Sequence, residues 1–231
     1  MEITKSTIKR ILLDIFFPKF CFGCQKEGTF LCEDCKSLLE ISGFHQKYKT
    51  ENLEDLYFAV GYQNPLIKKL IQKFKYPPLV KELANPLASL IIDHLQLIGK
   101  ETSFANAVLI PAPLEKKRLK WRGFNQAEEI GKVLAEFFKI PILTNVLFKT
   151  KNTKSQVELA KEEREKNIKG AFEVKNQNLI ERKRIFLIDD IYTTGSTLKE
   201  AAQILKTAGA KEIIGIVIAR AKPEEDFLPK S

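Results

Sequence analysis

The chain has 231 residues, of which 44% are hydrophobic and 10% aromatic, so it can bury a substantial core and is not a disordered protein. Its 38 Lys and Arg residues against 29 Asp and Glu give a formal net charge of +9, which favours an anionic ligand such as a phosphorylated metabolite or a nucleic acid. The length suits one medium domain and a small additional module.

Residues 1–20, MEITKSTIKRILLDIFFPKF, partly imitate a signal peptide. Asp14 interrupts the apolar stretch and no small-residue cleavage site follows, so the segment is predicted to form an amphipathic helix. No other apolar run approaches the ~18 residues that span a bilayer. We therefore expect a cytoplasmic protein without a membrane partner.

All four cysteines lie in the stretch CFGCQKEGTFLCEDC, as Cys21, Cys24, Cys32 and Cys35. Two CxxC pairs at this spacing present four thiolates at the corners of a tetrahedron, which structural zinc prefers. Two disulfides and a redox or iron–sulfur site are the alternatives. A closed four-sulfur site leaves no open coordination position, so such a zinc ion would serve folding and docking rather than chemistry.

After the cysteines the sequence alternates between apolar strands and helical periodicity. We place a boundary in a polar stretch and expect an N-terminal helix and zinc-binding module over 1–48 and a second domain over 49–231. Strands are predicted at 56–62, 106–113, 142–150, 170–174, 184–190 and 212–220, and helices at 64–76, 79–98, 125–139 and 155–169. This alternation predicts an α/β fold with a mainly parallel sheet covered on both faces.

The most basic stretch, PLEKKRLKWRGF, follows the strand that ends at Pro111, Ala112 and Pro113. We interpret it as a loop whose cations hold a pyrophosphate or a nucleic-acid backbone, and whose aromatic side chains stack on a base. A solvated charged face is the alternative. The candidate contacts are Lys116, Lys117, Arg118, Lys120, Trp121, Arg122 and Phe124.

The stretch IDDIYTTGST, residues 188–197, is predicted to be a strand end, a turn and the start of a helix that ends near Ala208. Thr197 and Glu200 have the spacing of a capping box, and Gly209 suits a C-terminal cap. Because ligands of parallel sheets lie beyond the carboxyl ends of the strands, this turn and the Pro111–Pro113 segment should converge.

The turn suits a phosphate, because the helix start offers unpaired N–H groups and Gly195 has no Cβ. Thr193, Thr194, Ser196 and Thr197 add hydroxyl groups, whereas Asp189 and Asp190 would repel a bare phosphate. The acids fit a phosphate carried on a sugar whose hydroxyl groups donate to them, or a divalent cation between acids and oxygens. Ribose 5-phosphate meets both needs, while a solvated loop at a sheet edge is the alternative.

FLIDDIYTTGSTL resembles the phosphoribosyl-pyrophosphate (PRPP) signature of type I phosphoribosyltransferases. Together with the four cysteines, RGFNQA and the order of the other motifs, the chain resembles the ComF family of bacterial competence proteins, including its GntX-like relatives. The resemblance implies a type I phosphoribosyltransferase domain behind a zinc finger, with PRPP and Mg²⁺ as ligands. It assigns the ribose hydroxyls to Asp189 and Asp190, the 5-phosphate to residues 193–197 and the pyrophosphate to Pro111, Ala112 and Pro113.

By the same resemblance, Gln156 and Arg164, with Asn167, belong to a segment that folds over the ligand. Three hypotheses follow. The first is a PRPP-binding competence protein that handles incoming single-stranded DNA during natural transformation. The second is an active phosphoribosyltransferase or amidophosphoribosyltransferase of nucleotide or related metabolism, and the third is an adaptor whose zinc module docks a DNA-translocating ATPase.

Overall fold

A computed structural model describes residues 18–45, 47–100, 104, 106–150 and 170–221. The chain forms two compact units, Met1–Glu40 and Ile41–Ser231. The first contains the four cysteines and the short helix α2 (Glu33–Ser37). Residues just after Glu40 belong to the second unit, since Ser42 N donates to Ala59 O at 2.8 Å and His45 Nε2 lies 2.8 Å from Asp55 Oδ2. The division at residue 48 stays a prediction.

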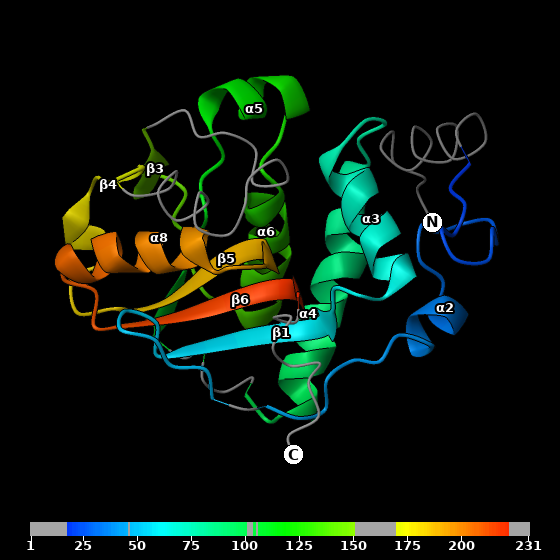
Figure 1. The fold of residues 1–231 in the computed structure, drawn as a ribbon, viewed down its shortest axis with the longest axis horizontal. Coiled ribbons are helices and arrows are strands. Elements are labelled where there is room, and N and C mark those ends of the chain that lie inside the picture. The colour runs from blue at the N-terminus through cyan, green and yellow to red at the C-terminus, as the bar shows by residue number, and fades with distance from the viewer. Residues whose placement is uncertain (1–17, 46, 101–103, 105, 151–169, 222–231) are drawn as a thin grey trace, which may run out of the picture. The chain divides into compact units, whose positions relative to one another are not determined.

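The second unit is built on a four-stranded sheet in the order β1-β6-β5-β2, and every pairing is parallel. Figure 1 shows the arrows of β1, β5 and β6 pointing the same way. The expected α/β class with a parallel sheet is confirmed. The strands are β1 (Asp55–Gly61), β2 (Ala107–Pro111), β5 (Arg184–Tyr192) and β6 (Glu212–Arg220).

Helices cover both faces of this sheet. Alternate residues of each strand point to opposite sides, so each face has apolar side chains that pack against helices. In β5, Ile185 and Leu187 join a buried cluster with residues of α8 (Ser196–Thr207). The ring of Phe186 points the other way and stacks on Phe104, with 4.0 Å between ring centroids. That second face is covered by α4 (Ala84–Leu97) and α6 (Gln126–Phe138).

Two further strands form a separate antiparallel pair, β3 (Leu147–Lys149) and β4 (Phe172–Val174). They lie within the predicted strands 142–150 and 170–174, but β3 is much shorter than expected. Near the start of the longer segment, Ile142 makes an isolated bridge to Leu109. The predicted helix at 155–169, most of the helix at 1–20 and the C-terminal tail lie outside the described residues.

The other elements of the described residues are α3 (Pro65–Lys75), α5 (Lys116–Arg122) and two short 3-10 helices, Lys81–Leu83 and Gln177–Leu179. Our expectation of a loop in the basic stretch is wrong, because α5 occupies most of it. Its positively charged side chains have good intrinsic helix propensity, and Gly123 ends the helix at φ +77°. Within the described ranges, no helix is both long enough and apolar enough to cross a membrane.

Candidate functional site

A cleft of about 490 Å³ brings the two predicted ligand segments together in the second unit. Ala112 and Pro113 follow β2, while Asp189, Asp190, Thr193 and Thr197 come from the end of β5 and the start of α8. The expected convergence is confirmed. The other lining residues are Tyr62, Ile71, Gln72, Lys75, Tyr76, Leu114, Arg118, Arg122, Asn125, Gln126, Ala127, Lys149 and Ile191.

The acid pair is held in an unequal environment. Asp190 N donates to Asp189 Oδ1 at 2.9 Å, and Asp190 Oδ1 lies 2.7 Å from Lys75 Nζ. Burial raises the pKa of Asp189 to about 7, with the charge of Asp190 adding to the effect and Lys75 opposing it. Burial alone would lower the pKa of the Lys75 ammonium, but Asp190 outweighs it and raises that pKa. The cleft therefore contains an acid pair neutralised in part by a lysine.

The turn after β5 requires glycine at position 195 because of its backbone conformation and the packing of Tyr192. Gly195 takes φ +76°, and a Cβ placed there would overlap the hydroxyl group of Tyr192. Tyr192 is held in place, since its hydroxyl donates to Tyr48 Oη at 2.9 Å. Thr194 and Ser196 form a hydroxyl pair at 2.7 Å. A small hollow lies directly over this turn, lined in part by Thr193, Gly195, Ser196 and Thr197.

The predicted capping box is wrong, because Gly195 is the N-cap of α8 and makes no side-chain cap hydrogen bond. Glu200 instead accepts from Gly170 N at 2.6 Å. At the helix start, Ser196 N donates to Thr194 Oγ1 at 3.4 Å, so the preceding turn and not Glu200 pairs this N–H group. Its other end is as predicted: α8 ends at Thr207, and Gly209 follows at φ +95°.

The opposite wall is fixed by the motif RGFNQA. Ala112 N donates to Ile188 O at 2.7 Å, and Asn125 Nδ2 donates to Ala112 O at 3.0 Å. These bonds hold Ala112 at the mouth of the cleft. Pro111 is the last residue of β2, is buried, and does not line the cleft.

Helical geometry sorts the basic side chains of α5 into two groups. Arg118 and Arg122, four residues apart, line the cleft. The Nε atom of Arg122 is buried and has no hydrogen-bond partner among the described residues, while its Nη1 donates to Gln126 Oε1 at 3.0 Å. The side chains of Lys116, Lys117, Lys120 and Trp121 are exposed and lie outside the cleft.

Phe124 is only 8% exposed, and its ring contacts Phe74 with 5.5 Å between centroids. The structure thus places this side chain in the packing between α3 and α6 and not on a surface where a base could stack. Of the two candidate stacking residues, Trp121 is the exposed one, at 56%.

Sequence reasoning missed two cations of the cleft, Lys75 and Lys149. Lys75 ends an amphipathic helix and gives no local signal of a site. Lys149 ends β3, and burial lowers the pKa of its ammonium, with Arg118 adding to the effect. A position at a strand end was the available signal for Lys149. The predicted contacts Gln156 and Arg164, and also Asn167, lie outside the described residues.

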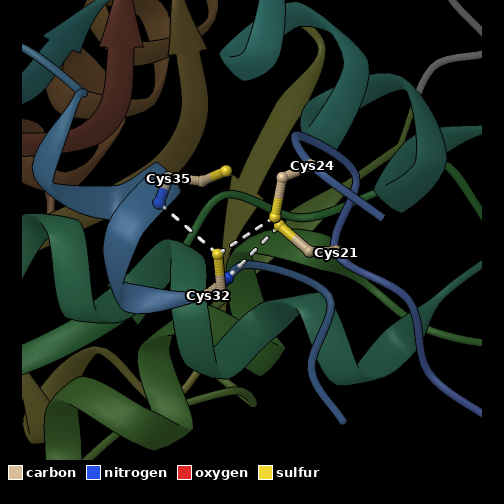
Figure 2. A group of neighbouring side chains, drawn as sticks. All are labelled: Cys21, Cys24, Cys32 and Cys35. Carbon is tan, nitrogen blue, oxygen red and sulfur yellow. Dashed lines mark hydrogen bonds between the residues drawn. The ribbon is translucent and has the colours of Figure 1, made fainter. Parts of the chain in front are cut away.

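The cysteine cluster belongs to the first unit. Figure 2 shows the sulfur atoms of Cys21, Cys24, Cys32 and Cys35 facing one another, and all four lie within 4.8 Å of each other as free thiols. Four sulfurs bound tetrahedrally to zinc at about 2.3 Å stand about 3.8 Å apart. The cluster therefore has the donor set and dimensions for one such ion.

Backbone N–H groups favour the thiolate form of Cys21. Cys32 N donates to Cys21 Sγ at 3.4 Å (Figure 2). Burial acts to raise the pKa of the Cys21 thiol, but backbone N–H groups of Cys24, Cys32 and Gly23 together outweigh it and lower the pKa to about 6. Since thiolate is the metal-binding form, this sulfur is prepared for a cation.

Residues 122–230 match the family described as phosphoribosyl transferase domain. Together with the parallel sheet, this match defines the chain as a protein with a type I phosphoribosyltransferase domain. Among solved structures, glutamine PRPP amidotransferase from Bacillus subtilis complexed with ADP and GMP is 20% identical, with a TM-score of 0.36. That alignment covers 59% of this chain and spans only 25% of the amidotransferase chain.

Two relatives that align with most of the chain identify the family within this class. Competence protein F of Haemophilus influenzae is 32% identical over 209 residues, covering 87% of this chain and 90% of the relative. Competence protein ComFC of Bacillus subtilis is 34% identical over 202 residues, covering 83% of this chain and 79% of the relative. The chain belongs to the ComF family of competence proteins.

Proposed function

We propose that the cleft binds PRPP. The carboxylates of Asp189 and Asp190 accept hydrogen bonds from the ribose hydroxyls, while the start of α8, which follows Gly195, and the hydroxyl groups of Thr193, Thr194, Ser196 and Thr197 hold the 5-phosphate. The observation that carries the proposal is that the two acids, Thr193 and Thr197 of the turn, and four basic side chains line one cleft. Ala112, Pro113, Arg118 and Arg122 line the same cleft, and we assign them to the diphosphate attached to the same ribose.

Magnesium is part of this proposal. Carboxylate oxygens are ligands that Mg²⁺ accepts, but Asp190 Oδ1 is already engaged by Lys75. We therefore assign the metal mainly to the diphosphate oxygens, and it would supply positive charge there. The protein's own side chains orient the sugar and balance the charge of its phosphates.

Transfer of the ribosyl phosphate to an acceptor is a second candidate function. In the described part of the cleft wall the only carboxylates are Asp189 and Asp190, and no histidine lines it. An acceptor would therefore arrive as a free nucleophile, such as an amine, or be deprotonated by the acid pair itself. The reaction would depend on positioning and on charge stabilisation of the departing pyrophosphate.

The cellular role we propose is the handling of incoming single-stranded DNA in competence. Its support is membership of a family whose relatives are called competence proteins, together with the exposed Lys116, Lys117, Lys120 and Trp121 of α5. Positive side chains beside an aromatic ring suit single strands, because phosphates and bases are both contacted.

A thermal-shift titration with PRPP and Mg²⁺ tests the ligand. Wild type should melt at a higher temperature as PRPP rises, because a ligand that binds only the folded state stabilises it by about 2.7 kcal/mol at a hundredfold excess over Kd. Asp190→Asn should lose most of this shift. Glu173→Gln removes a carboxylate on β4 outside the cleft and should respond like wild type. An unchanged shift in Asp190→Asn counts against the ribose contact.

We also propose a structural zinc ion at Cys21, Cys24, Cys32 and Cys35, with partner docking as its use. Elemental analysis of the purified protein should give one zinc per chain, and Cys24→Ser should lower that content. If Cys24→Ser still shows the PRPP-dependent shift, the metal is not required by the cleft. A full zinc content in a variant lacking two of the cysteines would contradict the assignment.

A further inference from the structure

Lys75 is placed in the cleft by the pattern of the helix that carries it. Ile67, Leu70, Ile71 and Phe74 are buried along one side of α3, and Lys75 is its last residue. Its side chain is 20% exposed and lines the cleft, with Nζ 2.7 Å from Asp190 Oδ1. An occupant of the cleft next to Asp190 is therefore within reach of this ammonium group.

The residues on both sides of Lys75 are clamped by the motif RGFNQA. Gln126, only 2% exposed, donates from Nε2 to Phe74 O at 2.8 Å and accepts from Arg122 Nη1 at 3.0 Å. On the other side of Lys75, the guanidinium of Arg122 lies 5.5 Å from the ring centroid of Tyr76. Such fixing lowers the entropy that Lys75 must lose when it contacts a ligand.

We propose that Lys75 is an additional ligand-binding residue of the cleft, a resident cation that joins Asp190 to the anionic oxygens of a phosphorylated ribose. This inference rests on the proposed binding of PRPP. An ammonium group has three N–H donors, and within the described structure Asp190 is its one hydrogen-bond partner. Two donors remain for ligand oxygens, while Asp190 Oδ2 remains for a ribose hydroxyl.

The charges of the cleft favour a role in which Lys75 contacts the ligand, over one in which Lys75 competes with the ligand for Asp190. Lys75, Arg118, Arg122 and Lys149 line it together with two carboxylates, so the site has an excess of positive charge for a polyanion. PRPP would bring several negative charges next to Asp189 and Asp190, and Lys75 would reduce the repulsion between the ligand and these acids. Mg²⁺ on the diphosphate would reduce the same repulsion, so Lys75 should matter most when the metal is absent.

Isothermal titration of PRPP into wild type, Lys75→Gln, Lys75→Arg and Lys73→Gln, with Mg²⁺ and with EDTA, tests this role. Lys73 lies two residues earlier in α3, does not line the cleft, and gives the same change in net charge. In EDTA, Lys75→Gln should bind roughly tenfold more weakly than wild type, since a charge-assisted hydrogen bond is lost. With Mg²⁺ the loss should shrink to roughly threefold. Lys75→Arg should recover part of the affinity, and Lys73→Gln should match wild type.

Three results would overturn the inference. Tighter binding by Lys75→Gln would mean that Lys75 competes with the ribose for Asp190. An equal loss with and without Mg²⁺, accompanied by a lower melting temperature of the free protein, would mean that Lys75 only supports the fold. If wild type binds PRPP in neither buffer, both the proposed function and this inference are wrong. If wild type binds PRPP and Lys75→Gln binds it with the same affinity, only this inference is wrong.

Discussion

Two walls of one cleft use their sequence motifs in different ways. The β5–α8 wall, residues 188–197, places its acids, hydroxyl groups and glycine around a single strand-to-helix turn. The α5–α6 wall, residues 116–127, divides its motif: Arg118 and Arg122 line the cleft, while Phe124 packs in the interior and Gln126 holds the end of α3. The acids and Thr193 therefore face the cleft close together in the sequence of the first wall, whereas the basic and aromatic residues of the second wall separate into structural and ligand-facing sets.

The difference follows from backbone geometry. A turn at a helix start brings consecutive residues around one point, so a contiguous motif makes a contiguous site. A helix turns by about 100° per residue, so a basic run wrapped on it faces several directions. A motif therefore indicates its own site only when the local backbone keeps its residues together.

The strongest test of the α5–α6 wall is Phe124→Ala. Removing a buried ring that packs on Phe74 should lower the free energy of unfolding by about 3–5 kcal/mol. Urea unfolding followed by circular dichroism measures this loss. Trp121→Ala removes the exposed aromatic residue three positions earlier and should change stability by less than about 1 kcal/mol. Equal losses of stability would mean that Phe124 is not the buried ring and Trp121 the exposed one.

A smaller effect is expected in the β5–α8 wall from Gly195→Ala. The new Cβ would need the left-handed region and would overlap Tyr192, together costing about 2–4 kcal/mol. Gly123→Ala is the matched control, because Gly123 has nearly the same φ but nothing within 4 Å of an added Cβ. It should cost about 1–2 kcal/mol. Comparison of the two melting curves isolates the overlap with Tyr192, and equal losses would show that the overlap is relieved at no cost.

Much of the fold was predictable because its signals are local. The alternation of apolar strands with helical periodicity indicated the parallel α/β class, and the spacing of Cys21, Cys24, Cys32 and Cys35 indicated their cluster. The turn at Gly195 was placed for the same reason. The capping of α8 was not predictable from local signals. Thr197 and Glu200 have the spacing of a capping box, yet Glu200 contacts Gly170, which is remote in sequence.

The cations of the site show where sequence reasoning stops. Lys75 meets Asp190 because α3 packs on Phe124 and Gln126, and its position beside the buried side of α3 does not by itself identify this partner. Phe124 was expected to be a stacking residue because an aromatic among charges suggests a surface. Its burial depends on Phe74, a partner that only the tertiary fold supplies. Long-range packing therefore decides which members of a motif reach the ligand.

The smallest expected effect separates the two faces of α5. Arg122→Gln removes a cation that lines the cleft and should weaken PRPP binding roughly tenfold, whereas Lys120→Gln makes the same charge change on the exposed side and should leave PRPP binding unchanged. Binding of a single-stranded oligonucleotide should respond in the opposite order. Removing one cation that neutralises a phosphate of a single strand should reduce the slope of log K against log salt by about 0.7, so Lys120→Gln should flatten it measurably. Fluorescence anisotropy across a salt series gives this slope, and isothermal titration gives the PRPP affinity. If Arg122→Gln and Lys120→Gln weaken both ligands alike, the helix acts as one undivided basic surface and the division between its faces is wrong.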